Sequence, residues 1–513
     1  MRLVLIRPRN SSPYYDPEVQ EPLGLEYLAA WRKAAGDYVL VLDSAIEGAG
    51  DLKLARRAAS FQPETIGFSI TTAQEIKSVR SIYAECLQAL RGRRVRWVAG
   101  GNFVSTDPEA ALKLLPPDFV LVRFEGERAM DELAAASPGV EADGRLRTGL
   151  AVDNLDTIPF PARPFAAHVL ARGAAFNLQG SRGCHGACRY CCSPGMFVAA
   201  RRWRGRSPAH IAEEMSTLFH RYGACSFNFV DEDFLGANAV AATRARMFAE
   251  ELGRRQLRVA FSVQVRPGSL SPEAIDCLAG AGLVYVFMGI ESDDVEDFRR
   301  WHRPWTADPW PLVGLLRERG VEVNAGVLLF HSHSTFAGIR RFATKLREQR
   351  LLEYRSATNR LDAAPGSQIH QAALVAGQID GASPGPKALP YLDPRIGVLH
   401  ADLLEALAPL GPPSMQAVCE LPPALVRRRF ADVRRAGVNE LLKLAERLDD
   451  AVTQSLFALL DLHEKGMGSP GLVGTLRRQN LEIGCEAARD LAAHGFAKSF
   501  ESLREAIRID AGV

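Results

Sequence analysis

The sequence predicts an α/β protein in three parts: an N-terminal doubly wound, Rossmann-like domain, a central partial (β/α)6 barrel and a C-terminal α-helical domain. Up to about residue 370, short runs rich in Val, Ile and Leu alternate with amphipathic helical stretches, which is typical of βαβ units. From about residue 397 the chain is rich in Ala, Leu, Arg and Glu and has few strand signals. A length of 513 residues suits about three domains.

Changes in composition set the expected boundaries. The stretch DTIPFPARP places three prolines close together and favours an extended connector, and GASPGPKALPYLDP is a Gly- and Pro-rich loop. The expected segments are 1–150, the Rossmann-like domain; 151–172, a Pro-rich linker; 173–370, the barrel; 371–396, a loop-rich linker; and 397–513, the helical domain.

Hydrophobic periodicity assigns the elements in order. In the first domain we expect strands at 2–6, 38–42, 65–70, 95–99 and 120–122, with helices at 23–35, 52–61, 73–90 and 129–136. In the central domain we expect six strands at 176–179, 226–230, 258–265, 284–290, 321–329 and 352–357. Ser207 is expected to cap a helix that begins at Pro208. Six strands separated by helices favour a partial barrel over a flat sheet.

Composition excludes several classes of protein. Hydrophobic residues are 47% and charged residues 24%, which rules out disorder, collagen-like sequence and a coiled-coil rod. The 62 Lys and Arg nearly balance the 60 Asp and Glu, so net charge gives no case for a nucleic-acid or anionic-membrane partner. No apolar run reaches the roughly 18 residues of a membrane span. The start, MRLVLIRPRN, has the pattern of a first strand and not of a signal peptide, so we expect a cytoplasmic location.

The cysteines indicate a metal site. There are nine, an odd number, and four of them lie between positions 184 and 192. A disulfide framework would not be so uneven. The other five, expected to be small core residues, are Cys86, Cys225, Cys277, Cys419 and Cys485.

Cys184, Cys188 and Cys191 form a CxxxCxxC pattern in a Gly-containing loop that follows an expected strand. Zinc sites usually close with four ligands, often from two separated pairs, and no second pair is present. Three cysteines would leave one iron of a [4Fe–4S] cluster open to a small chelating molecule. Two alternatives stay open: a zinc knuckle with His185 as fourth ligand, and Cys192 in place of Cys191.

This loop resembles the CxxxCxΦC signature of the radical S-adenosylmethionine (SAM) superfamily, in which Φ is aromatic and is Tyr190 here. The resemblance implies that SAM binds the open iron and is cleaved to methionine and a 5′-deoxyadenosyl radical, inside a barrel that shields the radical. It places strand-end residues around SAM: carboxylates to hold the amino group, an arginine for the carboxylate and a segment facing the ribose. The SAM-binding residues so implied are Tyr190, Asp231, Glu232, Asp233, Arg266, Glu291 and Ser292.

The sequence departs from this family after the fifth expected strand. Where relatives often have a Gly-Leu-Pro turn, this chain reads Phe-His-Ser-His-Ser, with His331 and His333. We interpret these histidines either as proton donors or as polar loop residues.

The first domain resembles the cobalamin-binding domain that precedes many radical SAM enzymes. The similar segments are PLGLEYLA from Pro22, IGFSI from Ile66, AGGN from Ala99 and the turn FEGE from Phe124. Glycines at strand ends would let the backbone approach the corrin and its nucleotide tail. The cobalamin contacts so implied are Gly24, Gly67, Ser69, Gly100, Gly101, Asn102, Glu125, Gly126 and Glu127. No histidine precedes His168, so this domain has none to offer cobalt as a lower ligand.

The resemblance implies a cobalamin-dependent radical SAM methyltransferase that uses a [4Fe–4S] cluster, SAM and methylcobalamin to methylate an unactivated carbon of a small-molecule, natural-product or peptide substrate. An external one-electron donor of flavodoxin or ferredoxin type is implied as a partner. One alternative is a non-methylating cyclase, oxidase or ring-rearranging enzyme with the same cofactors. Another is a cobalamin or redox sensor with a regulatory cluster. No catalytic side chain can be named from the sequence.

Overall fold

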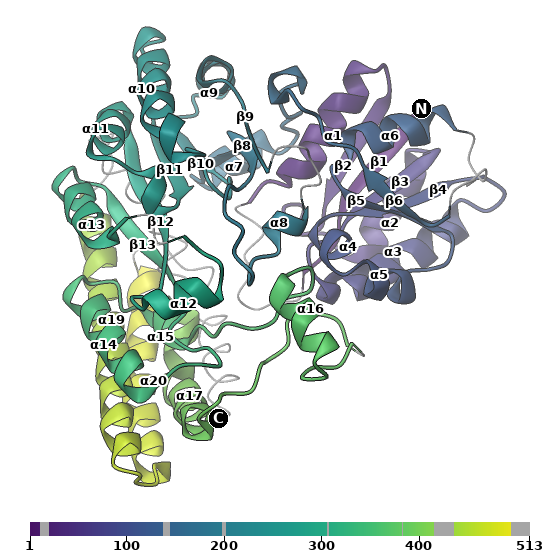
Figure 1. The fold of residues 1–513 in the computed structure, drawn as a ribbon. Helices are drawn as coiled ribbons and strands as arrows, with labels where there is room; N and C mark the ends of the chain where they lie inside the picture. Colours follow the sequence, from purple (N-terminus) through teal and green to yellow (C-terminus); the bar gives the residue numbers. More distant parts are fainter. Residues whose placement is uncertain are drawn as a thin grey trace. The chain divides into compact units, whose positions relative to one another are not determined.

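The computed structural model describes residues 1–10, 20–136, 144–196, 202–304, 307–381, 383–414 and 435–493, and its ribbon is drawn in Figure 1. The chain divides into two compact units. The first comprises Met1–Ala237, Glu250–Leu257 and Ala363–Lys387; the second comprises Asn238–Ala249, Arg258–Asp362 and Ala388–Val513.

The first unit begins with a six-stranded parallel sheet in the order β2-β1-β3-β4-β5-β6. Its strands are β1 (Arg2–Arg7), β2 (Tyr38–Asp43), β3 (Thr65–Ser69), β4 (Arg96–Gly100), β5 (Phe119–Phe124) and β6 (Leu146–Gly149). Its helices are α1 (Leu23–Ala34), α2 (Asp51–Ser60), α3 (Ile76–Ala89), α4 (Asn102–Thr106), α5 (Pro108–Leu114) and α6 (Glu127–Ala135). The strand order reverses at β1, and in such sheets ligands bind beyond the carboxyl ends of the strands at the reversal.

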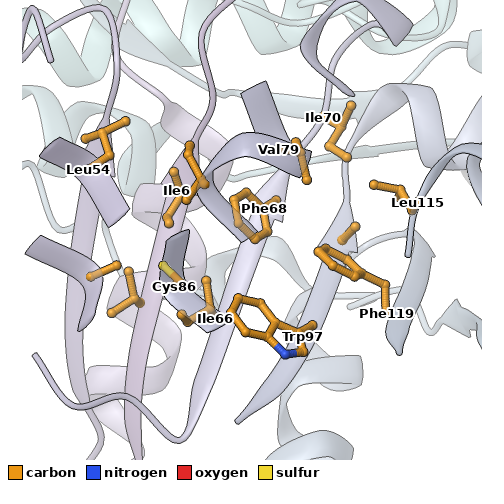
Figure 2. Packing of buried hydrophobic residues seen from close by; sticks show 14 of the residues in the cluster. Ile6, Leu54, Ile66, Phe68, Ile70, Val79, Cys86, Trp97, Leu115 and Phe119 are labelled. Atoms are coloured by element: carbon orange, nitrogen blue, oxygen red, sulfur yellow. The ribbon is translucent and has the colours of Figure 1, made fainter. Parts of the chain in front are cut away.

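Both faces of this sheet are covered. Val4 and Ile6 of β1 pack on one face in a cluster with residues of α2 to α5, whereas Leu3 and Leu5 pack on the other face with α1 and α6. The alternation follows from the strand repeat of two residues. Figure 2 shows the larger cluster, in which Cys86 lies among apolar side chains, as predicted for a small core residue.

The remainder of the first unit carries the cysteine loop. Strands β7 (Phe176–Leu178) and β10 (Ser226–Phe229) are parallel, and β8 (Ser181–Gly183) and β9 (Trp203–Gly205) are antiparallel. The helices are α7 (Ala166–Ala171), α8 (Ser193–Met196), α9 (Pro208–Tyr222) and α16 (Gln368–Val375). Ser207 caps α9 as predicted, because its side chain accepts a hydrogen bond from the His210 amide.

The second unit contains the parallel strands β11 (Ala260–Val265), β12 (Leu283–Glu291) and β13 (Glu322–Val327). Around them lie α11 (Pro272–Ala281), α12 (Val295–Arg300), α13 (Pro309–Glu318) and α14 (Phe336–Glu348). Helix α10 (Asn238–Arg254) has residues in both units. The C-terminal helices are α17 (Pro394–Leu407), α19 (Arg435–Glu464) and α20 (Pro470–Ala493).

The predicted fold class is confirmed: a parallel doubly wound domain, a central region of parallel strands with helices, and a helical C-terminal region. The strand predicted at 352–357 is wrong, because α15 (Tyr354–Thr358) is a helix. Glu353 and Ser356 form a reciprocal capping box that starts a helix there. Among the described residues, no helix is long and apolar enough to cross a membrane.

Candidate active site

The predicted cluster ligands follow β8 directly. Cys188 is buried, and Cys184 and Cys191 are half-buried. The Cys191 amide donates to the Cys188 carbonyl over 3.1 Å, which closes a tight turn between these two cysteines. The Arg189 carbonyl accepts from the Ile369 amide of α16 over 3.0 Å. The loop is therefore held both by its own turn and by a helix distant in sequence.

Gly186 leaves space between two of the sulfur atoms. Its amide lies 3.3 Å from Cys184 Sγ, to which it donates. A Cβ atom at this position would lie 3.4 Å from Cys184 Sγ and 3.5 Å from Cys188 Sγ. An amide donor and an uncrowded pair of sulfurs fit a cluster, whose properties depend on hydrogen bonds to its sulfurs. Among the described residues, no three His, Cys, Asp or Glu side chains group around a single-ion site. A cubane does not need that grouping, since each cysteine binds a different iron.

The thiol of Cys191 is costly to ionise without a metal. Burial raises the pKa of Cys191, and hydrogen bonds from Ser193 offset this only in part. Burial also raises the pKa of Cys192, and the carboxylate of Glu232 adds to the effect. A coordinated metal ion would deprotonate such a thiol outright.

The three acids after β10 have different surroundings. Asp231 is buried, and its carboxylate accepts hydrogen bonds from the Gly180 amide, at 3.0 Å, and from the Ser181 hydroxyl. The carbonyl of Asp233 accepts from Trp203 Nε1 at 2.8 Å. Glu232 is half-buried and accepts from the Gly183 amide at 3.3 Å. Asp231 thus fixes the turn that leads into the cysteine loop.

Glu232 is a carboxyl group that changes protonation near neutrality. Burial raises its pKa to about 7, helped by the neighbouring carboxylate of Asp231. Its side chain lines a cavity in the first unit. Of the three predicted acids, Glu232 is the one that lines this cavity.

This cavity has a volume of about 430 Å³ and lies at the carboxyl ends of β1, β3, β4 and β5. All nine residues predicted as cobalamin contacts line it: Gly24, Gly67, Ser69, Gly100, Gly101, Asn102, Glu125, Gly126 and Glu127. Leu5, Leu25, Val98, Val122 and Met130 also line it and make much of the wall apolar. The predicted residues come from four separate segments of sequence, which the parallel sheet brings to one edge.

Two glycines in this wall permit close approaches of the backbone. Gly101 has φ +100°, and a Cβ atom there would lie 2.6 Å from the Ile70 carbonyl oxygen. A Cβ atom at Gly126 would lie 3.0 Å from a methyl carbon of Leu28. The missing side chain at Gly101 lets the ends of β3 and β4 lie close together, and the one at Gly126 leaves room for α1. Neither glycine adds a side chain to the cavity wall, which suits a large planar ligand.

Glu125 and Glu127 are paired with arginines that the sequence analysis missed. Arg182 of β8 donates to Glu125 Oε2 at 2.9 Å and to Glu127 Oε1 at 2.7 Å. Arg204 of β9 also donates to both oxygens of Glu125. Burial by itself would raise the pKa of Glu127, but the Arg182 cation holds it below its usual range. The turn FEGE itself indicates that such partners exist, since two acidic side chains next to a buried strand need cations to balance their charge.

Three predicted SAM contacts belong to the second unit. Arg266 follows β11 and donates to the Ser269 hydroxyl at 3.3 Å. Glu291 ends β12 with φ +69° and pairs with Arg303 at 3.5 Å. Ser292 donates to Asp297 Oδ2 at 2.8 Å. Each lies at or just after the carboxyl end of its strand as predicted, and all three already bond to neighbouring polar side chains.

The two histidines after β13 differ from each other. His331 is buried, its Nε2 lies 3.2 Å from Asp297 Oδ2, and its Nδ1 accepts from the His333 amide at 3.3 Å. Both of its ring nitrogens are therefore engaged. His333 is exposed, and partial burial together with the nearby Arg300 cation lowers its pKa. Of the two, His333 retains a ring available for proton exchange.

Comparison with known proteins gives two family matches. Residues 17–134 match the B12 binding domain, and residues 178–343 match the Radical SAM superfamily. The first range contains all nine predicted cobalamin contacts, and the second contains the cysteine loop and all strands from β10 to β13.

Three curated proteins are similar over part of their length. An uncharacterized methyltransferase of Pyrococcus horikoshii is 28% identical over 291 residues, covering 53% of this chain and 61% of that protein. The hopanoid C-3 methylase of Methylococcus capsulatus is 24% identical, covering 55% and 56%. The anaerobic magnesium-protoporphyrin IX monomethyl ester cyclase of a Synechocystis strain is 26% identical, covering 45% and 50%. The chain thus spans half to three fifths of the length of these relatives.

Two solved structures share the fold. The cobalamin-dependent SAM radical enzyme OxsB, solved with aqua-cobalamin and SAM bound, matches with a TM-score of 0.73 at 15% identity, covering all of this chain and 83% of that chain. The radical SAM methyltransferase TsrM from Kitasatospora setae matches with a TM-score of 0.61 at 18% identity, covering 76% and 80%. The chain therefore carries a match to the B12 binding domain followed by a match to the Radical SAM superfamily, with the cysteine loop inside the second.

Proposed function

We propose that this protein is a cobalamin-dependent radical SAM methyltransferase that methylates an unactivated carbon of a small-molecule or peptide substrate. The observation that carries the proposal is that the cavity lined by the nine predicted cobalamin contacts lies in the same compact unit as the cysteine loop. Arg182, two residues before Cys184, lines this cavity, and so does Glu232, which accepts a hydrogen bond from the Gly183 amide. Among the similar proteins, that of Pyrococcus horikoshii is named a methyltransferase, that of Methylococcus capsulatus a methylase, and TsrM a methyltransferase.

In this proposal Cys184, Cys188 and Cys191 hold the cluster, and the nine cavity residues hold cobalamin. When bound, these groups and SAM supply a reducing electron, a 5′-deoxyadenosyl radical and a transferable methyl group. With cobalamin bound, the apolar part of the cavity wall would help to keep water away from a reactive radical. The Glu232 carboxylate would accept hydrogen bonds from the cationic amino group of SAM, as the resemblance implies.

Three residues of the second unit and one of the cysteine loop have proposed roles as well. Arg266 would pair with the SAM carboxylate, and Glu291 and Ser292 would face the ribose. Tyr190 precedes the last cluster ligand and would pack beside it. A low-potential flavodoxin or ferredoxin is the proposed electron donor.

The test is a product assay on the full chain. The protein is reconstituted anaerobically with iron, sulfide and hydroxocobalamin, reduced with titanium citrate and supplied with SAM carrying a deuterated methyl group. We expect both S-adenosylhomocysteine and 5′-deoxyadenosine by mass spectrometry, the first only when cobalamin is present. The Cys184→Ala/Cys188→Ala/Cys191→Ala variant is the matched control and should form no 5′-deoxyadenosine. A chain that cleaves SAM without the three cysteines would contradict the proposal.

A second candidate is a non-methylating enzyme of the same family. The cyclase relative, 26% identical over 259 residues, favours keeping it. It predicts 5′-deoxyadenosine without cobalamin-dependent S-adenosylhomocysteine, so the same assay separates the two functions.

A further inference from the structure

Arg182 links the cobalamin cavity, which its side chain lines, to the cysteine loop. It is on β8, two residues before Cys184, and its side chain is only 8% exposed. One end of its guanidinium donates to Glu125 at 2.9 Å and the other to Glu127 at 2.7 Å. These two carboxylates flank Gly126 in the turn that follows β5. One side chain therefore ties the end of the first sheet to the residues that lead into the cysteines.

The contacts of Arg182 require a planar, forked cation. Its two Nη atoms reach two different carboxylates, while its Nε donates to Gln179 Oε1 at 2.9 Å. Its guanidinium carbon lies 5.8 Å from the centre of the Tyr27 ring. Tyr27, Gln179, Glu125 and Glu127 all line the cavity, as Arg182 itself does. A lysine has a single charged nitrogen and cannot make these three directed contacts together.

We propose that Arg182 is a positioning residue, which fixes the position of the cysteine loop relative to the cobalamin cavity. Cobalamin in the cavity then alters the reduction potential and the electron paramagnetic resonance spectrum of the cluster. This inference rests on the proposed function. The chain from Arg182 to Cys184 is short, and the intervening Gly183 amide is bonded to Glu232, another cavity residue. A small displacement of Arg182 thus reaches the first cluster ligand through two peptide bonds. Cluster potentials respond to hydrogen bonds at the sulfurs and to solvent exposure.

Arg204 provides a matched control within the same ion cluster. It is directly opposite Arg182 in the β8–β9 pair, it is equally buried, and it binds the same Glu125. It lies on β9, which leads into α9 and carries no cysteine. A general loss of stability would affect the Arg182 and Arg204 variants alike, whereas a displacement of the cysteine loop from the cavity would affect only the Arg182 variant.

The test compares the full chain with Arg182→Lys and Arg204→Lys after anaerobic reconstitution with iron and sulfide. The midpoint potential and the electron paramagnetic resonance spectrum of the reduced cluster are measured with and without hydroxocobalamin. We expect hydroxocobalamin to shift both in the unaltered chain and in Arg204→Lys, and the shift to be lost in Arg182→Lys. The Arg182→Lys variant loses a charge-assisted bond to Glu125 or Glu127 in the cavity wall. It should therefore also bind hydroxocobalamin roughly tenfold more weakly.

A full shift in Arg182→Lys, or equal loss in Arg204→Lys, would overturn the proposal. If Arg182→Lys does not fold, Glu127→Gln decides, because it removes one of the two charged acceptors: a reduced shift supports the proposal and an unchanged shift overturns it. If the unaltered chain binds hydroxocobalamin with no change in its cluster, the proposal fails and the proposed function stands. If it binds no hydroxocobalamin, the proposed function fails and this inference with it.

Discussion

The backbone amide of Gly186 donates a hydrogen bond to the sulfur of Cys184 across 3.3 Å. An amide donor stabilises negative charge on the sulfur, so the loop is shaped for a thiolate before any metal arrives. The same glycine has no side chain to cover the sulfurs of Cys184 and Cys188. Both features concern Cys184 and Cys188, and they leave open whether Cys191 or Cys192 is the third ligand of the cluster.

Replacing Cys191 with Ala should abolish the cluster, whereas replacing Cys192 should leave it intact. Loss of a direct ligand is expected to lower cluster affinity by at least about 10- to 100-fold, since even outer-shell changes cost that much in metal sites. Iron and acid-labile sulfide per chain, measured after anaerobic reconstitution, check this. The reverse pattern would mean that Cys192 is the ligand.

Replacing Gly101 with Ala should destabilise the first unit and weaken its cobalamin binding. A side chain at φ +100° costs about 1–3 kcal/mol, and the added Cβ would also meet the Ile70 carbonyl at 2.6 Å. Thermal melting and hydroxocobalamin titration measure the two effects. For the melting measurement alone, Gly24→Ala is the control, since Gly24 lies in α1 and nothing lies within 4 Å of its would-be Cβ. A melting temperature for Gly101→Ala equal to that of the unaltered chain would refute the argument.

Replacing Arg163 with Met should unfold or strongly destabilise the protein. Its buried guanidinium contacts Glu21 at 2.7 Å, Glu214 at 2.9 Å and the Asn177 carbonyl at 2.7 Å. Removing one partner of a buried ion cluster leaves the others uncompensated, at a cost of about 3–5 kcal/mol.

The contrasting variant is Arg340→Met, whose ion pairs with Asp461 and Glu464 lie at the surface. Such exposed pairs contribute about 0–1 kcal/mol. Urea unfolding of both variants measures the difference. Equal midpoints would show that the buried cluster contributes no more than a surface pair.

The stability of the second unit should fall as pH rises, because of Asp449. Burial, with the nearby carboxylate of Glu353, raises the pKa of Asp449 to about 8. The folded state therefore holds this proton more tightly than the unfolded chain, whose Asp pKa is near 3.8. Between these values each pH unit lowers the free energy of unfolding by up to about 1.4 kcal/mol.

Asp449→Asn removes this titration. Its melting temperature should exceed that of the unaltered chain above pH 8, and its melting profile should be flatter between pH 5 and 8. Asp450→Asn, at an exposed neighbouring position, is the control and should change stability by less than about 0.5 kcal/mol. Parallel profiles for Asp449→Asn and the unaltered chain would contradict the raised pKa.

The cavity was predictable from sequence because each of its segments carries a local signal. Gly100 and Gly101 follow an apolar strand, and parallel topology brings such strand ends to one edge. The cysteine spacing is equally local. These patterns need no knowledge of distant partners, so residue order suffices to recognise them.

The ion cluster was not predictable, because it joins residues far apart in sequence. Arg182 and Glu125 are 57 residues apart, and Arg204 and Glu125 are 79 apart. Either arginine could have been an exposed charge, and only the fold reveals their partners. The wrong strand at 352–357 had a different cause: its apolar residues suggested a strand, whereas the capping box of Glu353 and Ser356 starts a helix.

The most direct test of the account is the metal content of the chain purified without oxygen. Analysis of iron, zinc and acid-labile sulfide, with an absorption spectrum before and after reduction, identifies what the cysteine loop holds. We predict about four irons and four sulfides per chain, as in a cubane cluster, all lost in the Cys184→Ala/Cys188→Ala/Cys191→Ala variant. Stoichiometric zinc in place of iron, or iron retained by that variant, would contradict the radical mechanism.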